Sequence, residues 1–159
     1  MNDQSDRQYL CLVYHDDAEL EALSQGDMDV LVADCLDWVD GLVRNGRHIY
    51  SAGLQSIRSA TTLRSRNGKV STTDGPFAET KEYLGGFTLF RARDLNEAIQ
   101  LASTLPAARI GTLEVRPVLQ SNADLDDPVD RKVAASLRRN HRAALQPYAP
   151  TERSTGASD

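Results

Sequence analysis

The stretch from residue 73 to residue 87 holds the side chains whose types and spacing could do chemistry. Asp74, Glu79 and Lys81 lie close together in it. A carboxylate beside an ammonium group in a partly closed cleft can transfer a proton while the lysine holds an anion. We therefore take Asp74 and Glu79 as candidate acid–base groups and Lys81 as the candidate charge stabiliser. The expected ligand is a small anionic or carbonyl compound.

The same stretch also has a purely structural interpretation. Residues 74–76 are typical of a turn, because aspartate can bond to nearby backbone, glycine has permissive dihedral angles and proline fixes φ. The charged residues that follow could form mixed ion pairs and lock two subunits together, and paired glycines allow close approach of a ligand or another backbone. Both interpretations stay open. The candidate ligand-binding residues of this stretch are Pro76, Phe77, Gly85 and Gly86.

Two further places carry candidate ligand-binding residues. Tyr14 and His15 end an apolar run and precede Asp16. A histidine beside an aspartate suggests acid–base work, although adjacent strand residues point to opposite faces. Glu114 and Arg116 are two residues apart and share a face. They either line the inner surface of a sheet or pair across a dimer.

Metal and cofactor motifs are missing from the sequence. His15, His48 and His141 are scattered and show no ExxH or HxH spacing, which predicts no metal site. The paired glycines belong to neither a GxxxxGK nor a GxGxxG pattern, so we expect no phosphate loop and no cofactor. Cys11 and Cys35 fall in apolar runs and are expected to be small core residues.

Apolar periodicity and turn signals predict an α+β fold that would position these residues. The expected elements are a strand over 9–14, a helix over 25–45, a strand over 48–54, a hairpin over 61–66 and 69–73, a strand over 84–92, a helix opened by Asp94 and ended by Pro106, and a strand over 112–119. Without the inserted hairpin the order is βαββαβ, the ferredoxin-like arrangement. Two helices cover only one face of such a sheet. The other face is then wet, forms a pocket or pairs with a second subunit.

The chain is expected to have two parts, a domain over 1–120 and a C-terminal extension over 121–159. The extension contains a basic helix over 131–144 and ends in a mobile tail. No aromatic residues interleave with its basic ones as stacking on nucleic-acid bases would require, so we expect a solvated or docked helix.

Composition excludes several classes of protein. The chain has 159 residues, of which 40% are hydrophobic and 26% charged, and this is typical of a globular domain. A net charge of −5 disfavours a nucleic-acid binder that works by neutralising phosphates. No apolar run approaches the roughly 18 residues of a membrane span, and the polar start is unlike a signal peptide. We therefore expect a cytoplasmic protein that contacts neither nucleic acid nor membrane.

The segment Thr73–Phe87 closely resembles the signature of the DGPF subgroup of YCII-related proteins. The tetrapeptide Asp74-Gly75-Pro76-Phe77 matches the subgroup's name, and Glu79-Thr80-Lys81-Glu82 and Gly85-Gly86-Phe87 extend the match. The resemblance covers residues 8–120 and implies a dimeric α+β barrel, in which the sheets of two subunits face each other. Some members of the wider family carry a His–Asp pair with the histidine on the first helix. The predicted helix over 25–45 has no histidine, so we do not transfer that pair.

Two functional hypotheses follow from the residues and the resemblance together. The first is a small-molecule-binding protein or a cofactor-independent enzyme that uses acid–base groups in a pocket. The second is a non-catalytic regulatory or assembly module, a homodimer stabilised by the DGPF loop. The two differ in whether Asp74, Glu79 and Lys81 face a cavity or are consumed in ion pairs.

Overall fold

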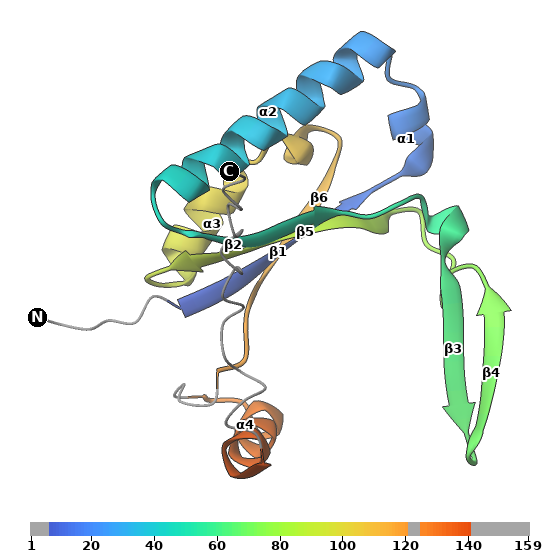
Figure 1. Ribbon diagram of the computed structural model, residues 1–159, viewed down its shortest axis with the longest axis vertical. Helices are drawn as coiled ribbons and strands as arrows, with labels where there is room; N and C mark the ends of the chain where they lie inside the picture. The colour runs from blue at the N-terminus through green and yellow to red at the C-terminus, as the bar shows by residue number, and fades with distance from the viewer. Residues whose placement is uncertain (1–6, 121–124, 141–159) are drawn as a thin grey trace, which may run out of the picture. The chain divides into compact units, whose positions relative to one another are not determined.

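The computed structural model describes residues 7–120 and 125–140. The chain divides into two compact units, Met1–Val118 and Leu119–Asp159. The elements of the first unit are β1 (Arg7–His15), α1 (Asp17–Glu21), α2 (Gln25–Arg44), β2 (His48–Gly53), η1 (Ile57–Ser59), β3 (Thr61–Arg66), β4 (Lys69–Asp74), β5 (Tyr83–Ala92), α3 (Leu95–Ser103), η2 (Pro106–Arg109) and β6 (Gly111–Pro117) (Figure 1).

The main sheet has the ferredoxin-like strand order. Its four strands run β2-β5-β1-β6 and every neighbouring pair is antiparallel. Helices α2 and α3 lie on one face of this sheet (Figure 1). The predicted α+β class, the βαββαβ order and the central position of the first strand are therefore confirmed.

The core lies between this sheet and the two helices. On β1 the side chains of Tyr9 and Cys11 face the helices, and on β5 Phe90 does the same from the neighbouring strand. All three are at most 1% exposed. The indole ring of Trp38 on α2 meets the Phe90 ring edge-on, with centroids 6.4 Å apart. Even-numbered residues of β1 point to the opposite face, as the two-residue period of a strand requires.

Local capping chemistry sets the ends of the helices. The Ser24 hydroxyl accepts a hydrogen bond from the Asp27 amide at 3.1 Å, and α2 ends before Gly46, whose φ is +66°. The Asp94 carboxylate likewise accepts the Glu97 amide at 2.8 Å and begins α3. The predicted starts of both helices are confirmed.

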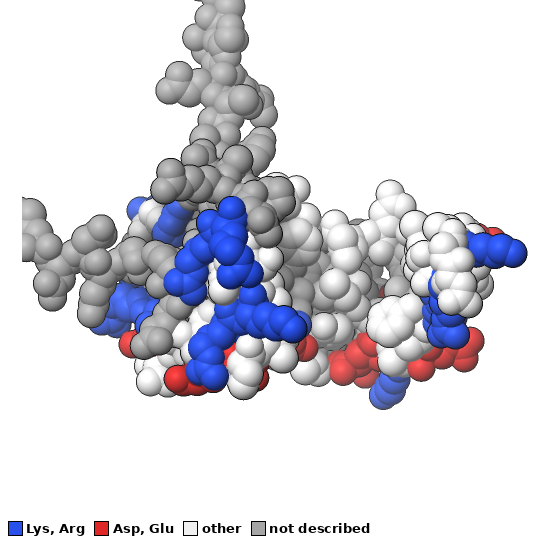
Figure 2. Space-filling model, turned by 90° about the horizontal axis from the view of Figure 1, so that it is seen from below, with Lys and Arg blue, Asp and Glu red and all other residues white. Residues whose placement is uncertain are grey.

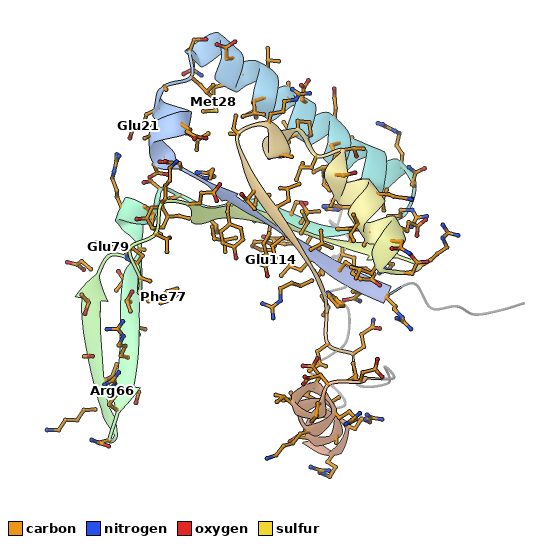
Figure 3. The ribbon with its side chains drawn as sticks, turned by 180° about the vertical axis from the view of Figure 1, so that it is seen from behind. Glu21, Met28, Arg66, Phe77, Glu79 and Glu114 are labelled. Carbon is orange, nitrogen blue, oxygen red and sulfur yellow. The ribbon has the colours of Figure 1, made fainter. Side chains whose placement is uncertain are left out.

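The β3–β4 hairpin projects from the end of the sheet on the side opposite the helices (Figures 1 and 3). Its turn residues Asn67 and Gly68 have φ of 51° and 75°, the left-handed conformations that an Asn-Gly turn predicts. At its base, the Gly75 amide donates to the Ala60 carbonyl at 2.7 Å, and the Thr62 hydroxyl donates to the Gly75 carbonyl at 2.7 Å. The inserted hairpin is confirmed.

Other expectations differ from the structure in their boundaries. Helix α1 was not predicted, because one turn is too short to show helical periodicity. Helix α3 ends at Ser103, and Pro106 instead begins the 3₁₀ turn η2, where its fixed φ suits a first position. In the second unit, α4 (Pro128–Asn140) begins before the predicted residue 131, because Asp127 accepts the Val129 amide.

Part of the predicted C-terminal extension lies beyond the residues that the structure describes. Residues 141–144 of the predicted helix and the predicted mobile tail lie outside the described residues. Within the described ranges no helix is long and apolar enough to cross a bilayer.

Candidate functional site

A groove of about 550 Å³ lies between α2 and the helix-facing side of the sheet. It forms because α2 diverges from the sheet toward its N-terminal end, where α1 follows β1 (Figure 1). Most of its wall is apolar, and its polar side chains come from three strands. The lining residues on the strands include Val13, His15, His48, Ser51, Gly85, Gly86 and Thr88. The lining residues on the helices include Leu20, Met28, Leu31, Cys35 and Leu36.

His15, the last residue of β1, contributes an imidazole to the groove and lies beside a carboxylate. Its Nδ1 is 3.7 Å from Oδ1 of Asp17, and the two side chains are 18% and 21% exposed. Nδ1 is buried and has no hydrogen-bond partner among the described residues. The Ser56 hydroxyl holds Asp17 by donating to Oδ2 at 3.0 Å. A small rotation would bring His15 Nδ1 and Asp17 Oδ1 from 3.7 Å to hydrogen-bonding distance.

A bulge in β5 makes room for this imidazole. Val13 pairs with Gly86 and Tyr14 with Leu84, so Gly85 has no partner on β1. A β-carbon at residue 85 would overlap the Nε2 end of the His15 ring. The glycine therefore lets the ring approach the strand closely, with its Nε2 edge against residue 85.

A second polar cluster lines the groove on strands β2 and β5. Nε2 of His48 is 2.9 Å from the Ser51 hydroxyl, which donates to the Thr88 hydroxyl at 3.0 Å. Burial lowers the pKa of His48, so its imidazole is neutral at neutral pH. A register shift between His48 and Tyr50 turns His48 to the same face as Ser51. Thr88 is only 5% exposed.

The cysteines do not form a reactive site. Burial raises the pKa of the Cys11 thiol to about 11, and this residue belongs to the core, as predicted. Burial also raises the pKa of Cys35, which packs against the core and lines the groove. Both thiols are therefore protonated at neutral pH and are weak nucleophiles. The described part of the chain holds no group of three His, Cys, Asp or Glu side chains placed to bind a metal ion.

The residues of the DGPF loop lie away from this groove. Asp74 ends β4, and Asp74, Glu79 and Lys81 are all exposed. Lys81 borders a separate hollow of about 560 Å³ that neither Asp74 nor Glu79 lines. The other residues around that hollow are Tyr14, Asp16, Glu19, Thr80 and Glu82. Three carboxylates around one ammonium group disfavour an anionic ligand there.

The remaining predicted site residues are distributed over both sides of the sheet. Pro76 and Phe77 lie at the base of the hairpin, and Phe77 is 79% exposed (Figure 3). Glu114 and Arg116 pair in register with Leu12 and Leu10 on the face opposite the helices. Their side chains lie 3.7 Å apart, from Arg116 Nε to Glu114 Oε1. Of the predicted site residues, the groove brings together His15, Gly85 and Gly86.

Sequence reasoning missed the partner of His15 and the second polar cluster. Strand alternation correctly separates His15 from Asp16, whose carboxylate instead accepts the Ala18 amide and begins α1. The chain turns into that helix immediately, and this brings Asp17 back beside His15. The His-x-Asp spacing was the available signal. Ser51 and Thr88 had none, since their grouping with His48 depends on strand register.

This geometry defines a class of protein: a ferredoxin-like α+β domain in which a histidine lines a groove under the first long helix and lies beside an aspartate. The model of the YCII-related domain matches residues 8–122. An uncharacterized protein of Rhizobium meliloti (strain 1021) is 36% identical over 112 residues, which cover 69% of this chain and 90% of that protein. The chain belongs to the YCII-related family.

Proposed function

We propose that this protein binds a small, mostly apolar carbonyl compound in the groove under α2 and transfers a proton to or from it through His15. The observation that carries the proposal is the approach of His15 Nδ1 to Asp17 Oδ1, 3.7 Å, while the ring's other nitrogen lies against Gly85 at the groove wall. Such an arrangement fits a general base whose protonated form is stabilised by a carboxylate.

The proton transfer needs no cofactor. His15 Nε2 takes a proton from the carbon beside the carbonyl, and the electron pair of that C–H bond moves toward the carbonyl oxygen to form an enolate. The imidazolium that results carries one positive charge, which Asp17 stabilises. Returning the proton to the same carbon restores the substrate, and returning it elsewhere isomerises it. The apolar wall strengthens the Asp17–His15 attraction by excluding water.

Hydrogen–deuterium exchange tests this proposal without knowledge of the natural substrate. A panel of small methyl ketones and aldehydes is incubated with the protein in D₂O, and loss of the proton signal beside the carbonyl is followed by NMR. We expect exchange above the buffer rate for at least one compound. His15→Asn should reduce the protein-dependent rate by about 100-fold or more.

The exposed loop supplies matched controls. Asp74→Asn, Glu79→Gln and Lys81→Met leave the groove intact and should not change the exchange rate. If these three variants abolished exchange while His15→Asn did not, the acid–base groups would be those of the DGPF loop. Absence of exchange with the whole panel would contradict proton transfer by this groove.

We further propose that the protein is a homodimer through the sheet face opposite α2 and α3. Apolar side chains follow this face in register, because Leu12 pairs with Phe87 and Leu10 with Leu89. Tyr50 on the edge strand is 52% exposed, and its ring centroid lies 6.0 Å from that of Phe87. A second copy would bury this surface, and the hairpin would extend beside it. Figure 2 views the molecule from the hairpin side.

In such a dimer the β3–β4 hairpin and the DGPF segment at its base could contact the second subunit. The hairpin exposes Leu63 and Val70 by 67% and 68%, and Phe77 follows at its base. An isolated two-stranded hairpin is marginally stable, so contact with another surface would stabilise it. The DGPF resemblance of residues 74–77 is consistent with a subunit-contact role for this segment, and the dimer and the groove are compatible because they use opposite faces of the sheet.

A further inference from the structure

A second polar cluster lies in the same groove, on the opposite side of β5 from His15. The His48, Ser51 and Thr88 side chains form an unbroken chain of hydrogen bonds, and all three line the groove. The chain joins two strands, since Ser51 and Thr88 are cross-strand partners in register. Polar groups placed together in a mostly apolar wall commonly orient a ligand.

This cluster can form a further hydrogen bond through the Thr88 hydroxyl. In the direction shown, the Ser51 hydroxyl donates to Thr88, and His48 then donates to Ser51 from Nε2. The Thr88 hydroxyl hydrogen is left without an acceptor within the described part of the chain. If the other imidazole tautomer is present, the chain reverses and Thr88 keeps free lone pairs instead. A ligand hydroxyl can serve in either direction because it both donates and accepts.

The groove lining sets the charge of the ligand group. Among the described residues, its titratable side chains are His15, His48 and Cys35, and none of them is a lysine or an arginine. Partial burial lowers the pKa of His48 and favours its neutral form, and a carboxylate or phosphate would be desolvated here without a cation. A neutral polar group therefore fits this end of the groove better than an anion.

Strand geometry gives the spacing between the two ends. The His15 ring lies over Gly85, and Thr88 is three residues further along the same strand. At a strand rise of about 3.3 Å per residue, the two polar positions are about 10 Å apart. Apolar residues of α2, including Leu31 and Leu36, line the same groove.

We propose that the His48–Ser51–Thr88 cluster is a specificity site that binds a neutral hydroxyl of the ligand, about 10 Å from the carbon on which His15 acts. The substrate class is therefore an elongated apolar carbonyl compound with a hydroxyl at its far end. The assignment of the reacting end rests on the proposed function, whereas recognition of the hydroxyl depends on this cluster alone.

Three straight-chain methyl ketones of equal length test the site. One ends in a hydroxyl, one in a methyl group and one in a carboxylate. In each compound about 10 Å separates the carbonyl group from the terminal group. Binding is measured by titration with NMR detection of the protein. We expect the hydroxyl compound to bind about three- to tenfold more tightly than the methyl compound, the value of one net hydrogen bond. The carboxylate should bind most weakly.

Variants of the cluster separate this contact from general binding. Thr88→Val keeps the side-chain shape, and Ser51→Ala removes the central hydroxyl; each should abolish the preference for the hydroxyl compound and leave the methyl compound unaffected. The matched control is Ser71→Ala on the exposed hairpin, which should change neither affinity. Unaltered binding of the methyl compound also shows that a variant is folded.

Different outcomes affect the two proposals differently. Equal affinity for the hydroxyl and methyl compounds, tightest binding of the carboxylate, a preference that survives Thr88→Val, or no binding by any of the three would each overturn the specificity site. If the hydroxyl preference is present and depends on Thr88 but no ketone exchanges its protons, the site stands and proton transfer by His15 fails. His15→Asn should retain the preference.

Discussion

The His15 imidazole occupies the space that a side chain at residue 85 would require. This contact brings a polar ring from β1 over a bulge in β5 and aligns it with the groove. The same ring faces Asp17 through its other nitrogen. The position of the acid–base candidate is thus set by a missing β-carbon on one side and a carboxylate on the other.

Gly85→Ala should displace the His15 ring. We expect a loss of stability of about 1–3 kcal/mol, the usual cost of overpacking, with proton exchange abolished. In a His15→Ala background the same substitution should cost much less, because the clashing ring is absent. Thermal melts of the four proteins in this cycle measure the coupling. Gly53→Ala is the control, since a β-carbon there meets nothing within 4 Å. Additive effects of Gly85→Ala and His15→Ala would disprove the steric account.

Asp17→Asn should reduce proton exchange by about tenfold or more, because the amide cannot stabilise the imidazolium as a carboxylate does. Ser56→Ala should give a smaller loss, since it removes only the 3.0 Å hydrogen bond that holds Asp17. The free energy of unfolding of both variants should lie within about 1 kcal/mol of that of the parent protein. Exchange rates are measured by NMR in D₂O. An unchanged rate in Asp17→Asn would remove the carboxylate from the mechanism.

His48 should make the protein less stable as the pH falls. Burial lowers its folded-state pKa below the ordinary value of 6.5, so the unfolded chain binds the proton more readily. The contribution of His48 to the free energy of unfolding is complete above the pKa that this residue has in the unfolded chain. It is lost as the pH falls through the pKa that the residue has in the folded protein. Comparing melting temperatures at about pH 8 and about pH 5.5 for the parent and His48→Gln measures it. The variant should lose less stability over this interval, and an equal loss would refute the prediction.

Leu12→Lys should convert the proposed homodimer to monomers. The residue lies opposite Phe87 on the sheet face away from the helices, and a lysine there would be buried without a partner charge in the dimer. We expect the dissociation constant to rise by about tenfold or more. Sedimentation at micromolar concentration measures it, with Val30→Lys on the exposed side of α2 as the control. A monomeric parent protein would rule the dimer out.

Removal of residues 121–159 should leave a folded domain. The first compact unit ends at Val118, and the match to the YCII-related domain ends at residue 122. The core cluster packed against the main sheet lies wholly within the first unit. A cooperative thermal melt of the truncated protein is the expected result, whereas a non-cooperative one would show that the extension completes the core.

The strands and the two longer helices of the first unit could be predicted because local chemistry determines them. Ser24 and Asp94 begin helices by accepting backbone amides, and Asn67-Gly68 turns a hairpin through left-handed dihedral angles. Apolar spacing separates strands from helices without reference to the rest of the chain. With strand and helix order known, the ferredoxin-like topology follows, and the residues of the DGPF loop identify the family resemblance.

The amino-acid sequence by itself determined the strands, the two longer helices and their order, and it indicated His15 as a candidate acid–base group, whereas only the tertiary structure decided which residues share a site. Bulges at Gly85 and between His48 and Tyr50 change which face a side chain occupies, and strand register pairs Ser51 with Thr88. A period of two cannot reveal either, because a one-residue shift moves every later side chain to the other face. The angle at which α2 leaves the sheet opens the groove, and that angle depends on packing between elements distant in the chain.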